Sequence, residues 1–181
     1  QKQHLELARD IANKFNTDYK KDIFLLPQPI FNKNSTRVMS LRDGSNKMSK
    51  SDISEYSRIL MTDNNDIITK KIKKAKTDSL KMPDTIKDAE SRLEINNLIN
   101  IYSASSGIDK QSVIDDFALK DIIDFKKSLT EVIIEVVEPI ALEANKLIND
   151  TKYLEVILKE GAEKAREISS KKISDLYTII G

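Results

Sequence analysis

Residues 121–149 read DIIDFKKSLTEVIIEVVEPIALEANKLIN, and this stretch decides the fold class. Its apolar residues recur at steps of three and four, which is the period of one helix face. That face contains Ile122, Phe125, Leu129, Val132, Ile133, Val136, Ile140 and Leu147. Pro139 lies inside the stretch and should kink it, because proline lacks the backbone N–H and crowds the preceding turn. The pattern predicts a long amphipathic helix.

Helical patterns also occur on both sides of this stretch. We expect helices over residues 3–15, 63–76, 90–105, 112–119, 151–160 and 161–179. Gly107 is expected to end one of them, and Gly161 to form a joint between the last two. Short apolar runs precede residue 62: residues 23–26 fit a buried strand or an extended connector, and residues 37–41 form another run. The chain is therefore predicted to be mainly α.

Composition narrows the functional classes. The 181 residues are 39% hydrophobic and 33% charged, which is typical of a soluble globular protein with a modest core. The absence of Cys excludes disulfides and thiolate metal sites, and a single His leaves little for an imidazole site. No apolar run approaches the roughly 20 residues of a membrane span, and no secretory signal is visible, so a cytoplasmic protein is expected. The net charge of +1 neither favours nor excludes nucleic acid.

The segment Lys47-Met48-Ser49-Lys50-Ser51-Asp52 has neither helical nor strand periodicity. It follows a turn at residues 43–46, rich in residues that tolerate unusual backbone angles, so we expect an exposed, movable loop. Lysine ammonium groups act as point charges for phosphate oxygens, and serine hydroxyls and loop N–H groups add donors. Such a loop can close over a triphosphate and neutralise charge on a leaving pyrophosphate. The alternative is a solvated Lys/Ser loop, because short motifs produce many chance matches.

Lys47–Ser51 resembles the KMSKS signature of class I aminoacyl-tRNA synthetases without departure. With Arg37–Leu41 upstream and Asp52 downstream, it is similar in particular to tryptophanyl-tRNA synthetases of the bacterial type. Other stretches resemble the same family: residues 1–7, 70–72, 75, 77–78, 97–98, 101–102, 106–107 and 161–165. They follow the family's order and cover nearly the whole chain.

The resemblance implies roles for individual residues. Lys47 and Lys50 would contact the ATP phosphates as the catalytic groups. Val38 would touch the adenine. Gln1, which matches the last residue of the family's G-E-D-Q motif, would lie beside the substrate amino acid. The implied ATP-binding set is Val38, Lys47, Met48, Ser49, Lys50 and Ser51.

The resemblance also implies an organisation and a reaction. Residues 1–60 would be the C-terminal part of a Rossmann-like α/β nucleotide-binding domain, and residues 61–181 a helical-bundle domain that binds the tRNA anticodon. The enzyme would join L-tryptophan to ATP, release pyrophosphate and pass the amino acid to tRNA(Trp). ATP is expected with Mg²⁺, without a permanent cofactor or a protein metal site, in a homodimer without membrane contact. The family's first ATP-binding signature lies upstream of this stretch, so the chain alone is expected to be inactive.

Two other functions stay open. The first is a tyrosyl-tRNA synthetase, which has a related loop. The second is a non-catalytic helical RNA-binding or interaction module derived from a synthetase.

Some residues have both a structural and an RNA-binding interpretation. The lysines at 70, 71, 73, 74 and 76 fit a solvated helix face, or contacts with the tRNA backbone. Tyr102 and Tyr153 fit core packing by default, or stacking on an anticodon base.

Overall fold

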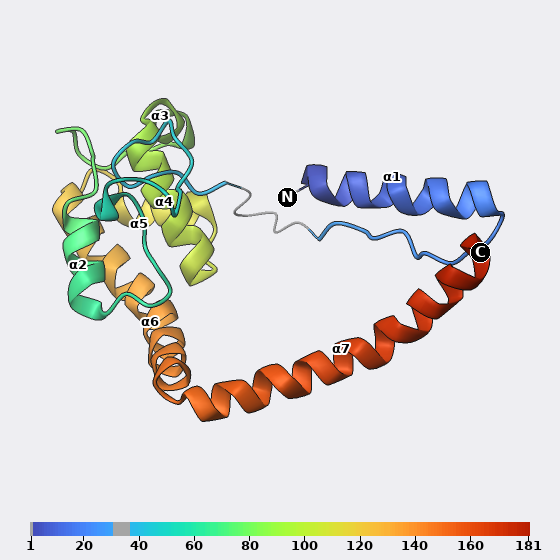
Figure 1. Cartoon of the computed structure of the whole chain (residues 1–181). Helices are drawn as coiled ribbons and strands as arrows, with labels where there is room; N and C mark the ends of the chain where they lie inside the picture. Colours follow the sequence, from blue (N-terminus) through green and yellow to red (C-terminus); the bar gives the residue numbers. More distant parts are fainter. Residues whose placement is uncertain (1, 31–36) are drawn as a thin grey trace. The chain divides into compact units, whose positions relative to one another are not determined.

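The structure, a computed structural model, describes residues 2–30 and 37–181. These residues form seven α-helices and one short 3-10 helix, with no β-strand longer than a single bridged pair (Figure 1). The elements are α1 (Lys2–Tyr19), η1 (Glu55–Ser57), α2 (Asn65–Lys73), α3 (Ile86–Ser91), α4 (Leu93–Ser106), α5 (Lys110–Phe117), α6 (Ile122–Asn149) and α7 (Thr151–Ile180). The prediction of a mainly α chain is confirmed.

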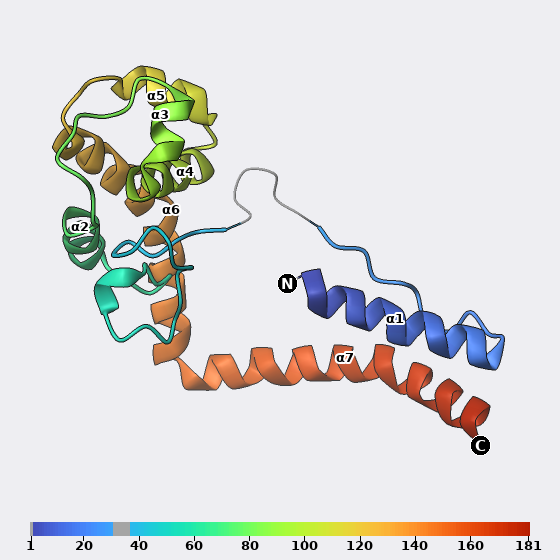
Figure 2. The same cartoon turned by 90° about the horizontal axis from the view of Figure 1, so that it is seen from above.

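The chain divides into two compact units, Asn32–Asn149 and a unit made of Gln1–Phe31 and Asp150–Gly181. Helices α2 to α6 and the candidate loop belong to the first of these units. Within it, α6 packs against α2 and α4, while α3 and α5 pack on α4 (Figure 1 and Figure 2). The predicted functional boundary near residue 60 lies inside this unit and stays a prediction.

Helix α6 provides the line of contact around which this unit packs. Its buried residues lie four apart: Phe125, Leu129, Ile133, Val137 and Ala141. The predicted apolar face was correct at Phe125, Leu129 and Ile133, but Val136 and Ile140 are exposed. A four-residue step exceeds one turn of 3.6 residues, so the line of contact winds around the helix and passes to Val137. The helix continues through Pro139, and the expected kink there stays a prediction.

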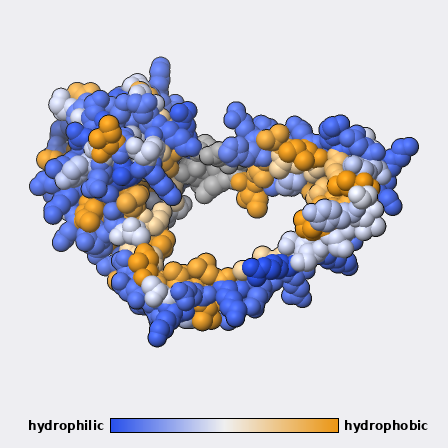
Figure 3. Space-filling model, viewed as in Figure 1, coloured by the Kyte–Doolittle hydropathy of each residue, from blue (hydrophilic) through white to orange (hydrophobic). Residues whose placement is uncertain are grey.

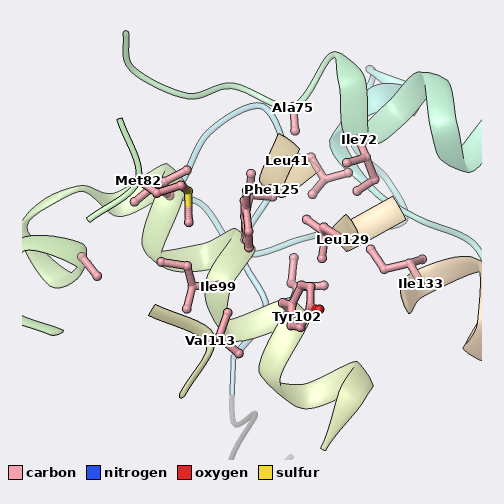
Figure 4. Close-up of a cluster of buried hydrophobic side chains, with 14 of the residues drawn as sticks. Leu41, Ile72, Ala75, Met82, Ile99, Tyr102, Val113, Phe125, Leu129 and Ile133 are labelled. Carbon is pink, nitrogen blue, oxygen red and sulfur yellow. The ribbon is translucent and has the colours of Figure 1, made fainter. Parts of the chain in front are cut away.

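Aromatic and aliphatic side chains from α2, α3, α4 and α5, and from the segments between helices, complete the core (Figure 4). Tyr102 of α4 stacks on Phe125 with ring centroids 5.8 Å apart and meets Phe117 of α5 edge-on at 5.7 Å. Its hydroxyl lies 3.2 Å from the hydroxyl of Ser128, which satisfies the buried oxygen. Core packing is thereby confirmed for Tyr102. It is wrong for Tyr153, which is 54% exposed.

Of three predicted helix boundaries, one is confirmed and two are wrong. Gly107 ends α4 in the left-handed region with φ +76°, as expected. The single helix predicted over residues 90–105 is interrupted at Arg92, whose φ of −115° and ψ of 85° are not helical. Gly161 forms no joint, because α7 is continuous from Thr151 to Ile180. A helix tolerates an interior glycine at a cost of about 1 kcal/mol.

The unit that contains α1 is held by side-chain contacts with an extended segment. Asn16 accepts hydrogen bonds from the N–H groups of Ile23 and Phe24 and donates one to the Phe24 carbonyl at 2.8 Å. Phe24 also packs edge-on against Phe15 at 5.2 Å. Residues 23–26 are therefore an extended connector rather than a buried strand, and Leu25 is 95% exposed.

Helix α7 has no buried residue, although it carries many apolar ones. Its exposed apolar side chains include Tyr153, Val156, Ile157, Leu158, Ile168, Ile173, Tyr177 and Ile180. Orange apolar groups are visible along this helix and along α1 (Figure 3). In the part of the chain that the structure describes, no helix has the length and apolarity needed to traverse a bilayer.

A buried ion pair joins α2 to the segment before it. The Lys71 ammonium lies 2.5 Å from Oδ2 of Asp63, and both side chains are only 6% exposed. The same carboxylate oxygen accepts the Leu60 N–H at 2.8 Å. Helix α2 begins at Asn65 rather than at the predicted residue 63, so Asp63 lies outside the helix and faces it.

Replacing Lys71 by Met should lower the free energy of unfolding by about 3–5 kcal/mol, because it leaves a buried carboxylate without its counter-ion. Urea denaturation followed by circular dichroism would measure this loss. The matched control is Lys73→Met, on the exposed side of the same helix, which should change stability by less than about 0.5 kcal/mol. Equal effects of the two substitutions would contradict the assigned role of the pair.

Arg92 ties the loop after α2 to the break between α3 and α4. Its Nε and Nη2 donate to the two carboxylate oxygens of Asp78 at 2.8 and 2.7 Å, a bidentate arrangement. The hydrogen bonds from Arg92 lower the pKa of Asp78. Another donor of Arg92 reaches the Lys81 carbonyl at 2.9 Å.

Because the pKa of Asp78 is lowered by folding, its ion pair stabilises the fold fully above the ordinary carboxyl pKa of about 3.9. That stabilisation is lost as the pH falls through the lowered pKa of the folded state. The Asp78→Asn variant should therefore be less stable at neutral pH and lose less stability than the parent between pH 5 and pH 3. Denaturation curves across this range, with Asp175→Asn on exposed α7 as control, would detect it. Parallel pH profiles of parent and Asp78→Asn would refute it.

Candidate functional site

A short two-stranded pairing carries the KMSKS segment. Met39 and Lys47 face each other in an antiparallel bridge. On one side of this pair the Met48 N–H donates to the Val38 carbonyl at 3.1 Å, and on the other the Ser40 N–H donates to the Asn46 carbonyl at 2.8 Å. Val38, Lys47 and Met48, all predicted to bind ATP, are therefore brought together. The side chains of Val38 and Met48 are half-buried against the core.

The turn at residues 43–46 closes this hairpin. The Asp43 carboxylate accepts from the Ser45 N–H at 2.9 Å, from the Ser45 hydroxyl and from the Asn46 side-chain amide, each of the latter at 2.6 Å. The hydroxyl of Ser45 lowers the pKa of Asp43. The turn predicted from composition is present at this position.

Gly44 lies against the first residues of α4. A Cβ at this position would lie 2.8 Å from the Leu93 carbonyl carbon and 2.9 Å from the Glu94 nitrogen. Gly107 and Gly181 are the described glycines with positive φ, so Gly44 is needed for close approach and not for an unusual backbone angle. The expectation of unusual angles at this turn is corrected for Gly44.

Two further contacts anchor the hairpin to the rest of its unit. The Leu41 N–H donates to the Ser57 carbonyl at 2.9 Å, and the Leu41 carbonyl accepts from the Lys76 N–H at 2.7 Å. Leu41 itself is buried in the core. The strand that contains Val38 is thus held at its end, just before the hairpin turn.

Asn97 of α4 reaches the same strand from another side. Its Oδ1 accepts the Met39 N–H at 2.9 Å, and its Nδ2 donates to the Met39 carbonyl at 2.9 Å. The side chain is buried. No role in the site was predicted for Asn97 from the sequence, although one signal was present: an amide among the apolar residues Ile95, Leu98 and Ile99.

Beyond Met48 the loop is less firmly held. Residues 49–51 have the two serine hydroxyls 2.9 Å apart, and the Asp52 N–H lies 3.5 Å from the Ser49 carbonyl. Firm attachment resumes at Asp52, whose carbonyl accepts from Arg58 at 2.9 Å. Lys47 therefore lies in the paired region, whereas Lys50 lies in the free span.

Both lysine side chains are exposed. Within residues 2–30 and 37–181 no hydrogen bond or ion pair engages either ammonium group. They are available to an external anion, as the predicted phosphate contact requires. Gln1, the predicted substrate-binding residue, lies outside the described residues.

The lysine cluster on α2 and just after it divides into paired and exposed groups. Lys71 is buried in its ion pair, Lys74 lies 4.1 Å above the Tyr56 ring, and Lys76 lies 2.8 Å from Glu94. Glu94 raises the pKa of Lys76, and Lys76 lowers that of Glu94. These three lysines therefore have partners within the fold, whereas Lys70 and Lys73 are exposed, as both the solvated-face and the RNA-contact interpretations expect.

Two cations cap the end of α2 and belong to the fold instead of to a ligand site. Arg42 donates to the Lys74 carbonyl, and the Lys126 ammonium donates to the Ala75 carbonyl at 2.7 Å. Burial and the nearby Arg42 lower the pKa of Lys126. Cations at a helix C-terminus complement its partial negative charge.

For metals, the described residues contain no group of three or more His, Cys, Asp or Glu side chains that could hold an ion.

Residues 1–138 match the family described as tRNA synthetases class I (W and Y). The whole chain is 46% identical to a tryptophan–tRNA ligase of Caulobacter vibrioides, of which it spans 53%, and 46% identical to that of Rickettsia conorii, of which it spans 54%. The chain thus spans about half the length of the curated relatives it matches.

Solved structures give a similar result. The tryptophanyl-tRNA synthetase from Mycoplasma pneumoniae superposes on the whole chain with a TM-score of 0.80 at 28% identity, over 55% of its own length. That from Campylobacter jejuni, complexed with ADP and tryptophan, covers 99% of the chain with a TM-score of 0.67 at 30% identity, over 54% of its length.

Replacing Gly44 by Ala should destabilise the hairpin by about 1–3 kcal/mol, since the new methyl group meets the α4 backbone rather than a flexible side chain. Chemical denaturation would measure the loss. Gly161→Ala is the control: a Cβ there meets nothing within 4 Å, and alanine should stabilise the helix by up to about 1 kcal/mol. A Gly44→Ala variant as stable as the parent would contradict the close approach.

Proposed function

The chain belongs to the class I tRNA synthetases of the tryptophan and tyrosine group, and from this premise we propose that it is the C-terminal half of a tryptophan–tRNA ligase. The full-length protein would activate L-tryptophan with ATP, release pyrophosphate and transfer the aminoacyl group to tRNA(Trp). The observation that carries the proposal is an intact KMSKS loop in a chain that is 46% identical along its length to tryptophan–tRNA ligases.

In this proposal the two loop lysines stabilise negative charge on the triphosphate as it reacts. When the bond between the α- and β-phosphates breaks, charge accumulates on the leaving pyrophosphate. Positive groups aimed at that charge lower the barrier, because they bind the transition state more strongly than the ground state. Lys47 acts from a backbone already held by the Met39 pairing, and Lys50 acts after the free span closes on the nucleotide.

The remaining ATP contacts are assigned to Val38, Met48, Ser49 and Ser51. The half-buried Val38 and Met48 present apolar surface suited to the adenine side, and the serines offer hydroxyl donors. ATP enters as its Mg²⁺ complex, and no step is assigned to an ion held by this chain. Gln1 is proposed to lie beside the substrate tryptophan.

We assign residues 1–60 to the catalytic domain and residues 61–181 to the anticodon-binding domain. Lys70 and Lys73 are exposed on α2 and supply charge for the tRNA backbone. The full-length enzyme is proposed to act as a homodimer in the cytoplasm. The activity belongs to the full-length protein, because the family's first ATP-binding signature is not among these residues.

Two alternatives predict different outcomes in one assay. The family includes tyrosine enzymes, and an enzyme of that kind would exchange pyrophosphate with tyrosine. A non-catalytic RNA-binding module would exchange with no amino acid.

The decisive assay is ATP–pyrophosphate exchange by the full-length gene product with each of the twenty amino acids. We expect exchange with tryptophan alone. Exchange with tyrosine would identify the protein as a tyrosyl-tRNA synthetase. Exchange with no amino acid would favour the non-catalytic RNA-binding module.

Lys47→Met and Lys50→Met should each lower kcat for exchange by about 10²-fold, because each removes a charge that stabilises the transition state. Lys152→Met, on exposed α7, is the matched control and should leave kcat unchanged. Wild-type rates in both loop variants would refute the assigned role.

A further inference from the structure

The side chain of Asn97 takes the place of a third strand beside the KMSKS hairpin. In the antiparallel pair of Met39 and Lys47, the hydrogen bonds are made by the flanking residues, at Val38 and Ser40. The N–H and C=O of Met39 therefore point away from Lys47, toward the outer edge of the strand. Asn97 binds both groups there, each at 2.9 Å.

The primary amide is the side chain suited to this task. It presents one acceptor and one donor side by side, as a neighbouring peptide group does. Its burial makes the two bonds matter, because an unpaired amide or peptide group without water is costly. Asn97 is also 58 residues distant in sequence from Met39, so it attaches the loop-bearing strand to a separate helix.

Helix α4 contacts the hairpin at a second point, one turn earlier. The backbone of Leu93 and Glu94 lies against Gly44 at the hairpin turn. Met39 and Gly44 are thus both held against the same rigid helix. The position of Lys47, opposite Met39, follows from that of α4.

We propose that Asn97 is a positioning residue for ATP activation. It holds Met39 in place, and thereby holds Lys47, across the pair, where its side chain can contact the triphosphate. The inference rests on the proposed function for its catalytic consequence. Because α4 belongs to the proposed anticodon-binding domain, Asn97 is also a direct polar link from that domain to the ATP loop, beside the contacts at Leu41 and Arg42.

The neighbouring Asn96 provides a matched control. It lies on the same helix, and its buried Oδ1 has no hydrogen-bond partner among the described residues. Replacing Asn96 by Leu changes the same chemistry on the same helix without touching Met39. Asn97→Leu removes both bonds of the clamp, whereas Asn97→Asp keeps the shape and the acceptor but turns an oxygen toward the Met39 carbonyl.

The first test is steady-state pyrophosphate exchange by the full-length enzyme, at a temperature where circular dichroism shows each variant folded. Asn97→Leu should lower kcat/KM for ATP by about 10- to 100-fold, the loss expected from misplacing a catalytic group by about 1 Å. The KM for tryptophan should stay unchanged. Asn97→Asp should also lower kcat/KM for ATP, and Asn96→Leu should have the kinetic constants of the parent.

A merely structural role for Asn97 would give a different pattern. It would lower only the fraction of active enzyme, so that kcat per active site, counted by adenylate burst titration, and the KM for ATP would both stay at the parent's values. That pattern, or an equal loss in Asn96→Leu, would overturn the proposal. If Asn97→Leu does not fold, Asn97→Asp decides by the same criteria.

The second test does not depend on catalysis and therefore separates this inference from the proposed function. Amide hydrogen exchange should become about tenfold faster at Met39 and Met48 in Asn97→Leu, but not in Asn96→Leu, since the opened strand exposes both groups. Unchanged protection would overturn the positioning role even in an active enzyme. Faster exchange in a protein with no pyrophosphate exchange would retain the clamp and reject the proposed activity.

Discussion

The packing of α6 against α2 and α4 is the constraint on which the larger unit depends. Phe125, Leu129 and Ile133 are buried along one side of α6, and the aliphatic residues of α2 and α4 close around them. Burial of large apolar side chains, each contributing about 1.5–3 kcal/mol, gives this contact enough free energy to order the shorter helices and loops around it. The KMSKS segment contains little apolar surface of its own, so its order derives from this core. The half-buried Val38 and Met48 are the points where the loop joins the core.

Irregular chain is attached to helices by the same device in both units. Asn16 of α1 binds the N–H and C=O of Phe24, and Asn97 of α4 binds those of Met39. In each case a helix supplies a rigid base, and one amide satisfies the backbone groups of an extended segment that has no neighbouring strand on that side. This explains how extended segments are held in place although the described residues contain a single isolated β-bridge. It also leaves residues 49–51 free, because no comparable amide reaches them.

Local patterns predicted the helices, because an apolar stripe and a capping residue are both properties of neighbouring residues. They predicted the α6 face at Phe125, the stop at Gly107 and the turn at residues 43–46, but placed a joint at Gly161 and missed the break at Arg92. At that break Arg92 pairs with Asp78, which is 14 residues away in the sequence. For the site, the KMSKS motif identified Lys47 and Lys50 as candidates. The structure places Lys47 in the paired part of the hairpin and Lys50 in the less firmly held span after it. Asn97 and the close packing of Gly44 arise from contacts between distant segments, which periodicity does not report.

Side chains along a strand point alternately to opposite faces, so an error of one residue in the alignment of the hairpin would turn Lys47 to the opposite side. The amide of Asn97 does not by itself fix this alignment, because whichever residue lies opposite Lys47 turns its N–H and C=O outward and could bind a primary amide. The alignment is fixed by two residues that have no equivalent one position away: Leu41, which is buried in the core, and Gly44, whose missing Cβ lets the α4 backbone approach. A shift by one residue would put Ser40 or Arg42 in the place of Leu41, and Asp43 or Ser45 in the place of Gly44. The side on which the loop lysine is presented is therefore decided by a leucine and a glycine that take no part in the chemistry.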